Sequence, residues 1–267
     1  MKKYIAITAI TTASALMMGN SFAQTAPAAE VKPDPGPVTA NVTLASEYRY
    51  RGLAQTNSSP AIQGGFDYAH ESGFYIGNWN SSISWISDAQ TSAGTSSQIE
   101  MDFYAGYKKE VMPGLTLDGG ALQYYYPTKG MPSTYINANT TEVYVAATYD
   151  IATLKYSYAL TNLFGTADSS GASYTDLTLN YDTGWMGVTL NGHVGYQYVP
   201  SSTNSARTVA TSYSYTDWKL GITKDLGYGM NLAIAYIGTN ANIANYVNPQ
   251  GKNLGRGTGF ISLTKTF

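Results

Sequence analysis

From Asn41 to the C-terminus, apolar side chains alternate with polar or small ones at a period of two. The clearest stretch is residues 186–198, where Met, Val, Leu and Tyr dominate one face and Gly, Thr, Asn and His the other. About twelve segments of roughly ten residues show this pattern. Because successive side chains of a β-strand point to opposite faces, each segment is predicted to be a strand with one apolar face.

The connections between these segments alternate in length. Short links such as residues 70–73 and 182–184 alternate with longer polar links such as residues 87–97 and 127–140. A soluble sandwich or barrel has no reason to sort its loops in this way. Outer-membrane barrels combine an outward apolar face with short periplasmic turns and long extracellular loops. We therefore predict an all-β fold, a transmembrane antiparallel up-and-down β-barrel of about 12 strands.

Composition excludes several other classes. The chain of 267 residues has 24 Tyr and 27 Gly but only 12% charged residues, so the usual fillers of exposed helices are scarce. It has no Cys, which excludes a disulfide scaffold or a thiolate metal site. With 43% hydrophobic residues and a net charge of -2, it is not a disordered chain. No basic cluster indicates a nucleic-acid partner.

The N-terminal residues are predicted to stand apart from the barrel. Two lysines precede an apolar stretch, and Ser21 and Ala23 offer small side chains to a peptidase, a pattern typical of a signal peptide over residues 1–23. A membrane anchor is the alternative, but the apolar run is shorter than the about 20 residues that a spanning helix needs. Residues 24–38, rich in Ala and Pro, predict a periplasmic tail, which leaves residues 39–267 for the barrel.

Charged residues fall mainly on the polar face of the segments, which in an outer-membrane barrel lines the interior. The predicted pore-lining residues are Glu47, Arg49, Arg51, Asp67, Glu100, Asp102, Lys108, Asp118, Glu142, Lys155, Asp176, His193 and Lys219. Outward charges are predicted at Lys224 and Lys265, near periplasmic ends, where a lipid-facing Lys costs about 0–1 kcal/mol instead of about 2–4 at mid-depth. The excess of acids over bases in the lining predicts a slight preference for cations.

Glu47, Arg49 and Arg51 alternate along the first segment and are predicted to share the inner face of strand one. Two interpretations stay open. The residues form a basic constriction, or they form an interior ion-pair network, which is favoured because buried charges are usually paired. The predicted number of strands does not decide whether the lumen is open or filled. Barrels of about eight strands are filled by side chains, whereas barrels of about 16–18 strands enclose an aqueous channel.

The chain ends on an alternating segment with a terminal aromatic residue. Ile261, Leu263 and Phe267 share one phase, which matches the signal read by the barrel-insertion machinery. The predicted partners are therefore this machinery, outer-membrane lipid and small solutes. Aromatic residues near predicted strand ends suit the girdles at the two membrane interfaces. They are Tyr48, Tyr50, Tyr68, Trp85, Tyr107, Tyr196, Tyr198, Trp218 and Tyr236.

Two further function classes remain as alternatives: a closed structural or surface-interaction barrel, and a membrane-embedded hydrolase. The chain has two His, of which His70 is predicted in a short turn and His193 on an inner face. No GxSxG nucleophile pattern occurs, and no HExxH or EF-hand pattern indicates a metal site. We therefore predict no enzyme activity, no catalytic residue, no metal and no cofactor.

Four stretches of the sequence resemble the TorF porin family of proteobacterial outer-membrane proteins. They are residues 46–52 (SEYRYRG), 60–79, 215–227 and 262–267, and Glu47 stands where Asp is more usual. The resemblance runs from residue 40 to the end of the chain. It implies an outer-membrane barrel, and a porin-like channel for the passive diffusion of small hydrophilic solutes.

The predicted orientation of the faces can be tested by cell fractionation. The exported chain is expected in the outer-membrane fraction, and to dissolve only in detergent, because its apolar faces would contact acyl chains. A periplasmic protein in the same extract serves as the control. Recovery of the chain as a dissolved monomer without detergent would overturn the prediction.

Overall fold

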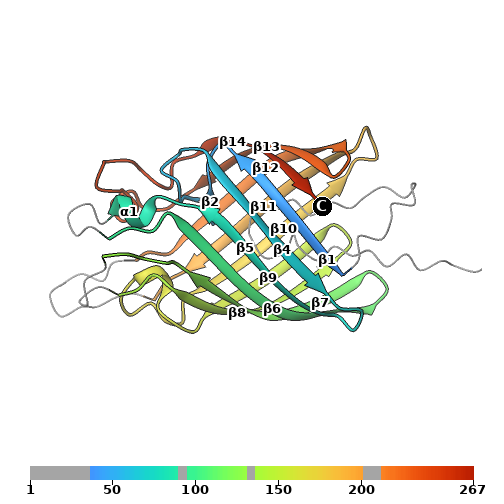
Figure 1. Cartoon of the computed structure of the whole chain (residues 1–267), viewed down its shortest axis with the longest axis horizontal. Coiled ribbons are helices and arrows are strands. Elements are labelled where there is room, and N and C mark those ends of the chain that lie inside the picture. The colour runs from blue at the N-terminus through green and yellow to red at the C-terminus, as the bar shows by residue number, and fades with distance from the viewer. Residues whose placement is uncertain (1–36, 90–94, 131–135, 201–211) are drawn as a thin grey trace, which may run out of the picture.

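The computed structural model describes residues 37–89, 95–130, 136–200 and 212–267. Twelve strands close into one antiparallel barrel, in which β1 pairs with both β4 and β14 (Figure 1). The wall strands are β1 (Val38–Ala45), β4 (Ala61–Ala69), β5 (Phe74–Ser82), β6 (Ile99–Met112), β7 (Leu115–Tyr125), β8 (Thr140–Tyr149), β9 (Ala152–Ala159), β10 (Ser173–Asp182), β11 (Val188–Tyr198), β12 (Tyr215–Gly227), β13 (Met230–Thr239) and β14 (Thr258–Thr266). The predicted fold class and strand number are confirmed.

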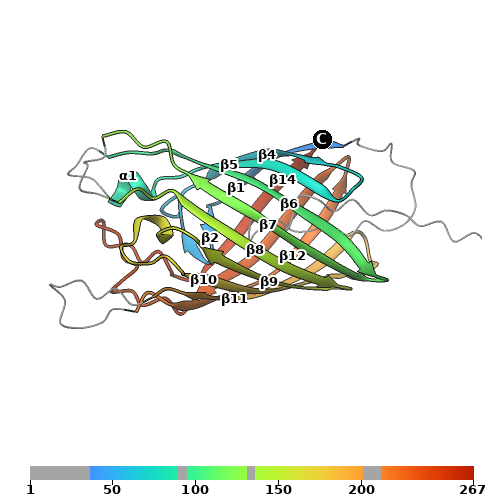
Figure 2. The ribbon, with the colours of Figure 1, turned by 90° about the horizontal axis from the view of Figure 1, so that it is seen from below.

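The two ends of the barrel differ in the length of their connections. The start of β1 and the end of β14 lie at the end that carries the short turns, which we call the short-turn end (Figure 2). The opposite, long-loop end carries the short helix α1 (Trp85–Ala89) and the 3₁₀ turn η1 (Leu163–Gly165). Within the described residues, no helix has the length and hydropathy needed to cross a membrane. The predicted signal peptide, residues 1–23, and residues 24–36 of the predicted tail lie outside the described residues.

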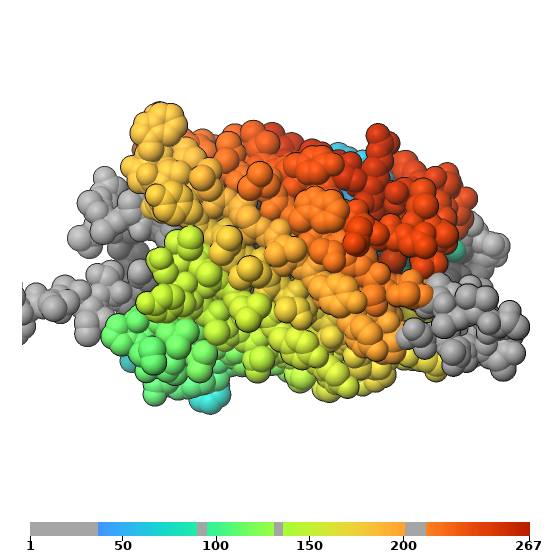
Figure 3. All heavy atoms as spheres, turned by 180° about the vertical axis from the view of Figure 1, so that it is seen from behind, coloured from blue at the N-terminus to red at the C-terminus, as the bar shows by residue number. Residues whose placement is uncertain are grey.

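The outer face of the barrel is apolar and the inner face is polar. On β12, the outward side chains of Trp218, Leu220 and Ile222 are 40%, 72% and 44% exposed, while the inward Asp217 and Lys219 are buried. Figure 3 shows one side of this outer face, over strands coloured green to red. Exposed apolar side chains that continue over neighbouring strands indicate that the outer face contacts an apolar phase rather than water.

On the described wall strands, three lysines, not two, face outward. Lys109 joins the predicted Lys224 and Lys265, because it continues the outward phase of β6 and is exposed beside its strand partner Leu117. The prediction missed it because β6 extends to Met112, beyond the segment recognised in the sequence. All three lysines lie near the short-turn end, where contact with lipid head groups lowers the cost of a charge.

Four inward tyrosines cover glycines of a neighbouring strand. A Cβ added at Gly195 on β11 would collide with the Tyr174 ring on β10. The same relation holds for Tyr75 over Gly106, Tyr104 over Gly77 and Tyr144 over Gly120. Glycine weakens a strand interior unless another group approaches its backbone closely, which is what these rings do. The rings therefore pack along the wall.

Substitution at Gly195 tests this packing. Gly195→Ala is expected to lower the free energy of unfolding by about 1–3 kcal/mol, because the added methyl group overpacks against the Tyr174 ring. The matched control is Gly192→Ala on the same strand, where a Cβ would lie 3.9 Å from the Leu179 Cβ, an ordinary contact, and no loss of stability is expected. Urea titrations of both variants in micelles would compare them. Equal stability of the two variants would contradict the packing argument.

Candidate pore and its inward-folded segment

Between β1 and β4 the chain leaves the wall and folds into the lumen (Figure 2). We call residues 46–60 the inner segment. Within it, β2 (Arg49–Tyr50) and β3 (Leu53–Ala54) form a small hairpin, whose turn residues Arg51 and Gly52 have φ angles of 46° and 78°. Two residues with positive φ fit a type I′ turn, the tight turn that suits the twist of a hairpin.

The predicted position of Glu47, Arg49 and Arg51 on the inner face of strand one is therefore wrong. Strand β1 ends at Ala45, before any of them. The sequence continues to alternate through this stretch because the hairpin has the same period as the wall strand. All three side chains are nevertheless inside the barrel and at most 6% exposed.

Tyr48 and Tyr50 bind the inner segment to one side of the wall. The Tyr48 hydroxyl donates to Glu100 Oε1 on β6 at 2.6 Å, and its ring packs edge-on against Trp79 on β5. The Tyr50 and Tyr124 hydroxyl oxygens lie 2.6 Å apart, which joins the segment to β7. Burial and the neighbouring Glu100 raise the pKa of Tyr48 well above its usual value, so its hydroxyl remains a donor.

Arg51 binds the segment to the next strands around the wall, from β8 to β11. Its Nη2 donates to both carboxylate oxygens of Glu142 on β8, at 3.0 and 2.7 Å, and its Nη1 donates to Gln197 Oε1 on β11 at 2.6 Å. The guanidinium carbon lies 4.7 Å from the Tyr50 ring centre and 4.3 Å from that of Tyr174 on β10. Charge-assisted hydrogen bonds of this kind are about twice as strong as neutral ones.

Arg49 joins the hairpin to the connection before β14. Its Nε lies 3.0 Å from Glu47 Oε2, in an ion pair buried from solvent. Its Nη1 donates to the carbonyl oxygens of Gly52, Leu254 and Arg256 at 2.9, 3.2 and 2.8 Å. Both arginines thus hold the inner segment through contacts within the protein.

The tip of the hairpin reaches β12 and β13. A Cβ at Gly52 would lie 2.8 Å from the Asp217 Cβ and would collide with Thr239. The inner segment therefore contacts β5, β6, β7, β8, β10, β11, β12 and β13, which surround the lumen. Each contact lies near the long-loop end of its strand, so the segment crosses the lumen at that end.

Starting near the short-turn end, charged residues follow one row of strand partners around the wall and reach the inner segment at Asp217. Directly paired positions lead from Lys108 to Asp118, Ala146, Lys155, Asp176, Gly195 and Asp217. Signs alternate from Lys108 to Asp176, and Ala146 and Gly195 separate the charged groups. We call this the charged row.

His193 connects the last two acids of the charged row. Its Nε2 lies 2.7 Å from Asp217 Oδ1, and its Nδ1 lies 3.3 Å from Asp176 Oδ1. The Tyr174 hydroxyl donates to Asp217 Oδ2 at 2.9 Å, and its ring also stacks on Arg51 of the inner segment. The charged row therefore meets the inner segment at this point.

The structure places the thirteen predicted pore-lining residues in two groups. Ten lie on inner faces of wall strands: Asp67, Glu100, Asp102, Lys108, Asp118, Glu142, Lys155, Asp176, His193 and Lys219. The other three belong to the inner segment. Asp217 was missed, although alternation with Lys219 could have found it. Tyr48, Tyr50 and Trp85 do not lie on the outer face as girdle residues. Tyr48 is 3% exposed, Tyr50 packs on Tyr124 inside the barrel, and Trp85 starts α1 and packs on Tyr126.

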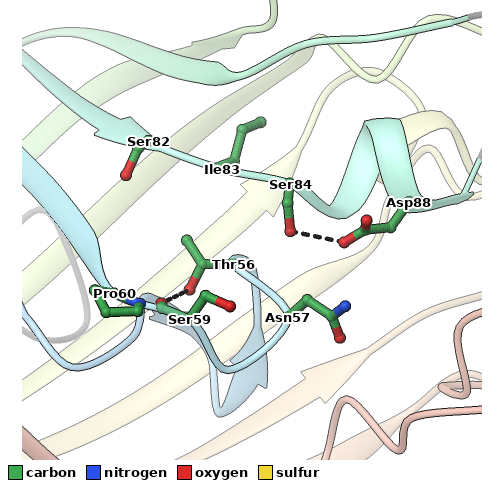
Figure 4. A pocket seen from close by; sticks show the side chains of 8 residues that line it. All are labelled: Thr56, Asn57, Ser59, Pro60, Ser82, Ile83, Ser84 and Asp88. Carbon is green, nitrogen blue, oxygen red and sulfur yellow. Dashed lines mark hydrogen bonds between the residues drawn. The ribbon is translucent and has the colours of Figure 1, made fainter. Parts of the chain in front are cut away.

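A pocket of about 280 Å³ opens beside the inner segment at the long-loop end (Figure 4). Its lining residues are Thr56, Asn57, Ser59, Pro60, Ser82, Ile83, Ser84 and Asp88. Two of the lining hydroxyl groups already have acceptors, since Ser84 donates to Asp88 Oδ2 at 2.7 Å and Thr56 to the Ser59 carbonyl at 2.6 Å. Within the described part of the chain, no group of three or more His, Asp or Glu side chains is arranged to hold a metal ion.

A closed barrel with an apolar exterior and a charged interior is the architecture of outer-membrane porins, and solved structures show this similarity. The KdgM porin matches with a TM-score of 0.52 at 7% identity, over 86% of this chain and 99% of its own. The KdgM porin in complex with disordered oligogalacturonate matches with a TM-score of 0.51 at 7% identity, over 86% and 98%. At this identity the similarity concerns the fold.

The chain belongs to the bacterial family described as "Bacterial protein of unknown function (Gcw_chp)", whose model matches residues 29–267. Among curated proteins, no sequence matches this chain. The match to this family does not confirm the resemblance to the TorF porin family, which stays a prediction.

The role of Arg51 in holding the inner segment can be measured with a cysteine reporter, because the chain has no Cys of its own. Ala54 on β3 is 2% exposed, so Ala54→Cys is expected to react slowly with a hydrophilic maleimide. Adding Arg51→Ala leaves Glu142 buried without its cation, at a cost of about 3–5 kcal/mol, and labelling should become about a hundredfold faster.

Tyr228→Cys is the matched control, because Tyr228 is 90% exposed and its labelling should be fast in both backgrounds. Arg51→Lys keeps the charge but loses the paired geometry, and should give an intermediate rate. If Ala54→Cys reacts equally fast with and without Arg51, the residue does not hold the segment.

Proposed function

We propose that the protein is an outer-membrane channel for the passive diffusion of small hydrophilic solutes, with the inner segment as its constriction. The observation that carries the proposal is the segregation of side chains in a closed barrel: apolar outward, charged and polar inward. An interior of this kind offers polar partners to hydrated solutes in place of water. The fold of the KdgM porin supports the same function.

The proposed location rests on the sequence and the fold together. The N-terminal pattern favours export, and the outward lysines lie only near the short-turn end, which we assign to the periplasm. The terminal Phe267 is exposed and in phase with the exposed Ile261 and Leu263, as recognition by the insertion machinery would require. The resemblance to the TorF porin family agrees with this proposal.

A closed structural or surface-interaction barrel is the second candidate. The contacts of the inner segment with eight wall strands favour it, since they cross the lumen from side to side. A hydrolase has less support. Among the described residues, the side-chain contacts of His193 are with Asp176, Asp217 and Tyr174, and none of them supplies the Ser or Cys nucleophile that a catalytic His would activate.

Conductance in planar bilayers separates these candidates. The refolded wild-type protein is expected to give small, discrete current steps. Arg51→Ala and Glu142→Gln should each raise the conductance or the open time, because either change breaks the ion pair that holds the inner segment across the lumen.

Lys109→Gln is the matched control, because it removes a charge from the outer face and should leave the current unchanged. Heat-modifiable migration in gels would verify that each variant forms a barrel. Absence of current steps in the wild type and in both ion-pair variants would reject the channel and leave the closed barrel.

A further inference from the structure

We propose that the charged row favours small zwitterionic solutes, such as free amino acids, over neutral solutes of equal size and over ions of either sign. This inference rests on the proposed channel function and names its solute class. The preference follows from the positions of the charged side chains in the lumen, rather than from their net charge.

The charged row covers most of the length of the lumen. Its first member, Lys108, lies near the short-turn end of β6, while Asp217 lies near the long-loop end of β12. Because the strands run obliquely to the barrel axis, a row of direct partners climbs as it passes around the wall (Figure 1). A solute moving between the short-turn end and the inner segment therefore passes its members in turn.

The row contains two directly paired sites of opposite charge. Lys108 is the strand partner of Asp118, and Lys155 is the strand partner of Asp176. Direct partners have Cβ atoms about 4.5–5.5 Å apart, so an ammonium and a carboxylate lie within reach of one small molecule. A zwitterion can place its carboxylate beside the Lys and its ammonium beside the Asp at both sites.

An ion with one charge meets attraction and repulsion in alternation along the same path. The sequence predicts a preference for cations because Glu100, Asp102 and Glu142 are included among the acids that line the lumen. These three are at most 2% exposed, and Glu100 and Glu142 bind Tyr48 and Arg51 of the inner segment. On the charged row itself, Lys108 and Lys155 alternate with Asp118 and Asp176, and His193 lies between Asp176 and the remaining acid, Asp217, so charges of both signs are interspersed along the path.

Liposome swelling with threonine and erythritol tests the inference, because the two solutes are similar in size and differ in charge. For wild-type protein we expect threonine to enter about three to five times faster than erythritol, a factor in the range that one weak ion pair confers. The double variant Lys155→Gln with Asp176→Asn should bring the ratio to one. The exchanged pair, Lys155→Asp with Asp176→Lys, keeps both charges and should preserve the ratio.

Lys108→Gln with Asp118→Asn provides an independent second pair, nearer the short-turn end, if the first variants do not fold. Lys109→Gln, on the outer face, should leave the ratio at its wild-type value. A reversal potential measured across a KCl gradient should lie near zero.

The outcomes distinguish the two proposals. If erythritol and threonine both fail to enter with wild-type protein, the channel function fails and the solute class with it. If erythritol enters but threonine is no faster, or if the foldable neutralised pair leaves the ratio unchanged, the channel stands and the zwitterion preference is overturned. A strong preference for cations or anions in the KCl gradient overturns it as well.

Discussion

The hydrogen-bonded closure of β1 on β14 is the constraint on which the rest of the structure depends. An open sheet presents a row of unpaired N–H and C=O groups, which an apolar surrounding cannot satisfy. Closure removes both edges and creates an interior at the same time. Charged side chains that would be costly outside, such as Asp176 and Lys219, then have an enclosed polar space in which to find partners.

The wall of this barrel was predictable because its signal is local. The two-residue period of apolar side chains indicates which residues of a strand share a face. The alternation of short and long links indicates which strand ends lie at the same end of the barrel. Residues such as Asp67, Lys155 and Asp176 were placed on the inner face by this reasoning alone. Lys109 was missed because β6 continues beyond the segment recognised in the sequence.

The inner segment was not predictable in the same way. Its residues continue the alternation of β1, and the hairpin turn within it needs a positive φ at Arg51, a residue type that rarely adopts that conformation. Its partners are distant in sequence, since Arg51 and Glu142 are 91 positions apart. Only the closed barrel brings such residues together, so composition and spacing could suggest paired charges without identifying the pairs.

The inner segment leaves the wall and returns to it at neighbouring points, since Ala45 and Ala61 are partners in the ladder of β1 and β4. The pairing of wall strands is therefore continuous whatever the fifteen intervening residues do. An insert attached in this way can be lengthened, shortened or replaced. Such a change alters the free cross-section of the lumen but leaves the register of the wall strands unchanged. Changes in the sequence of one short stretch of chain can thus alter what fills the lumen while the scaffold stays constant.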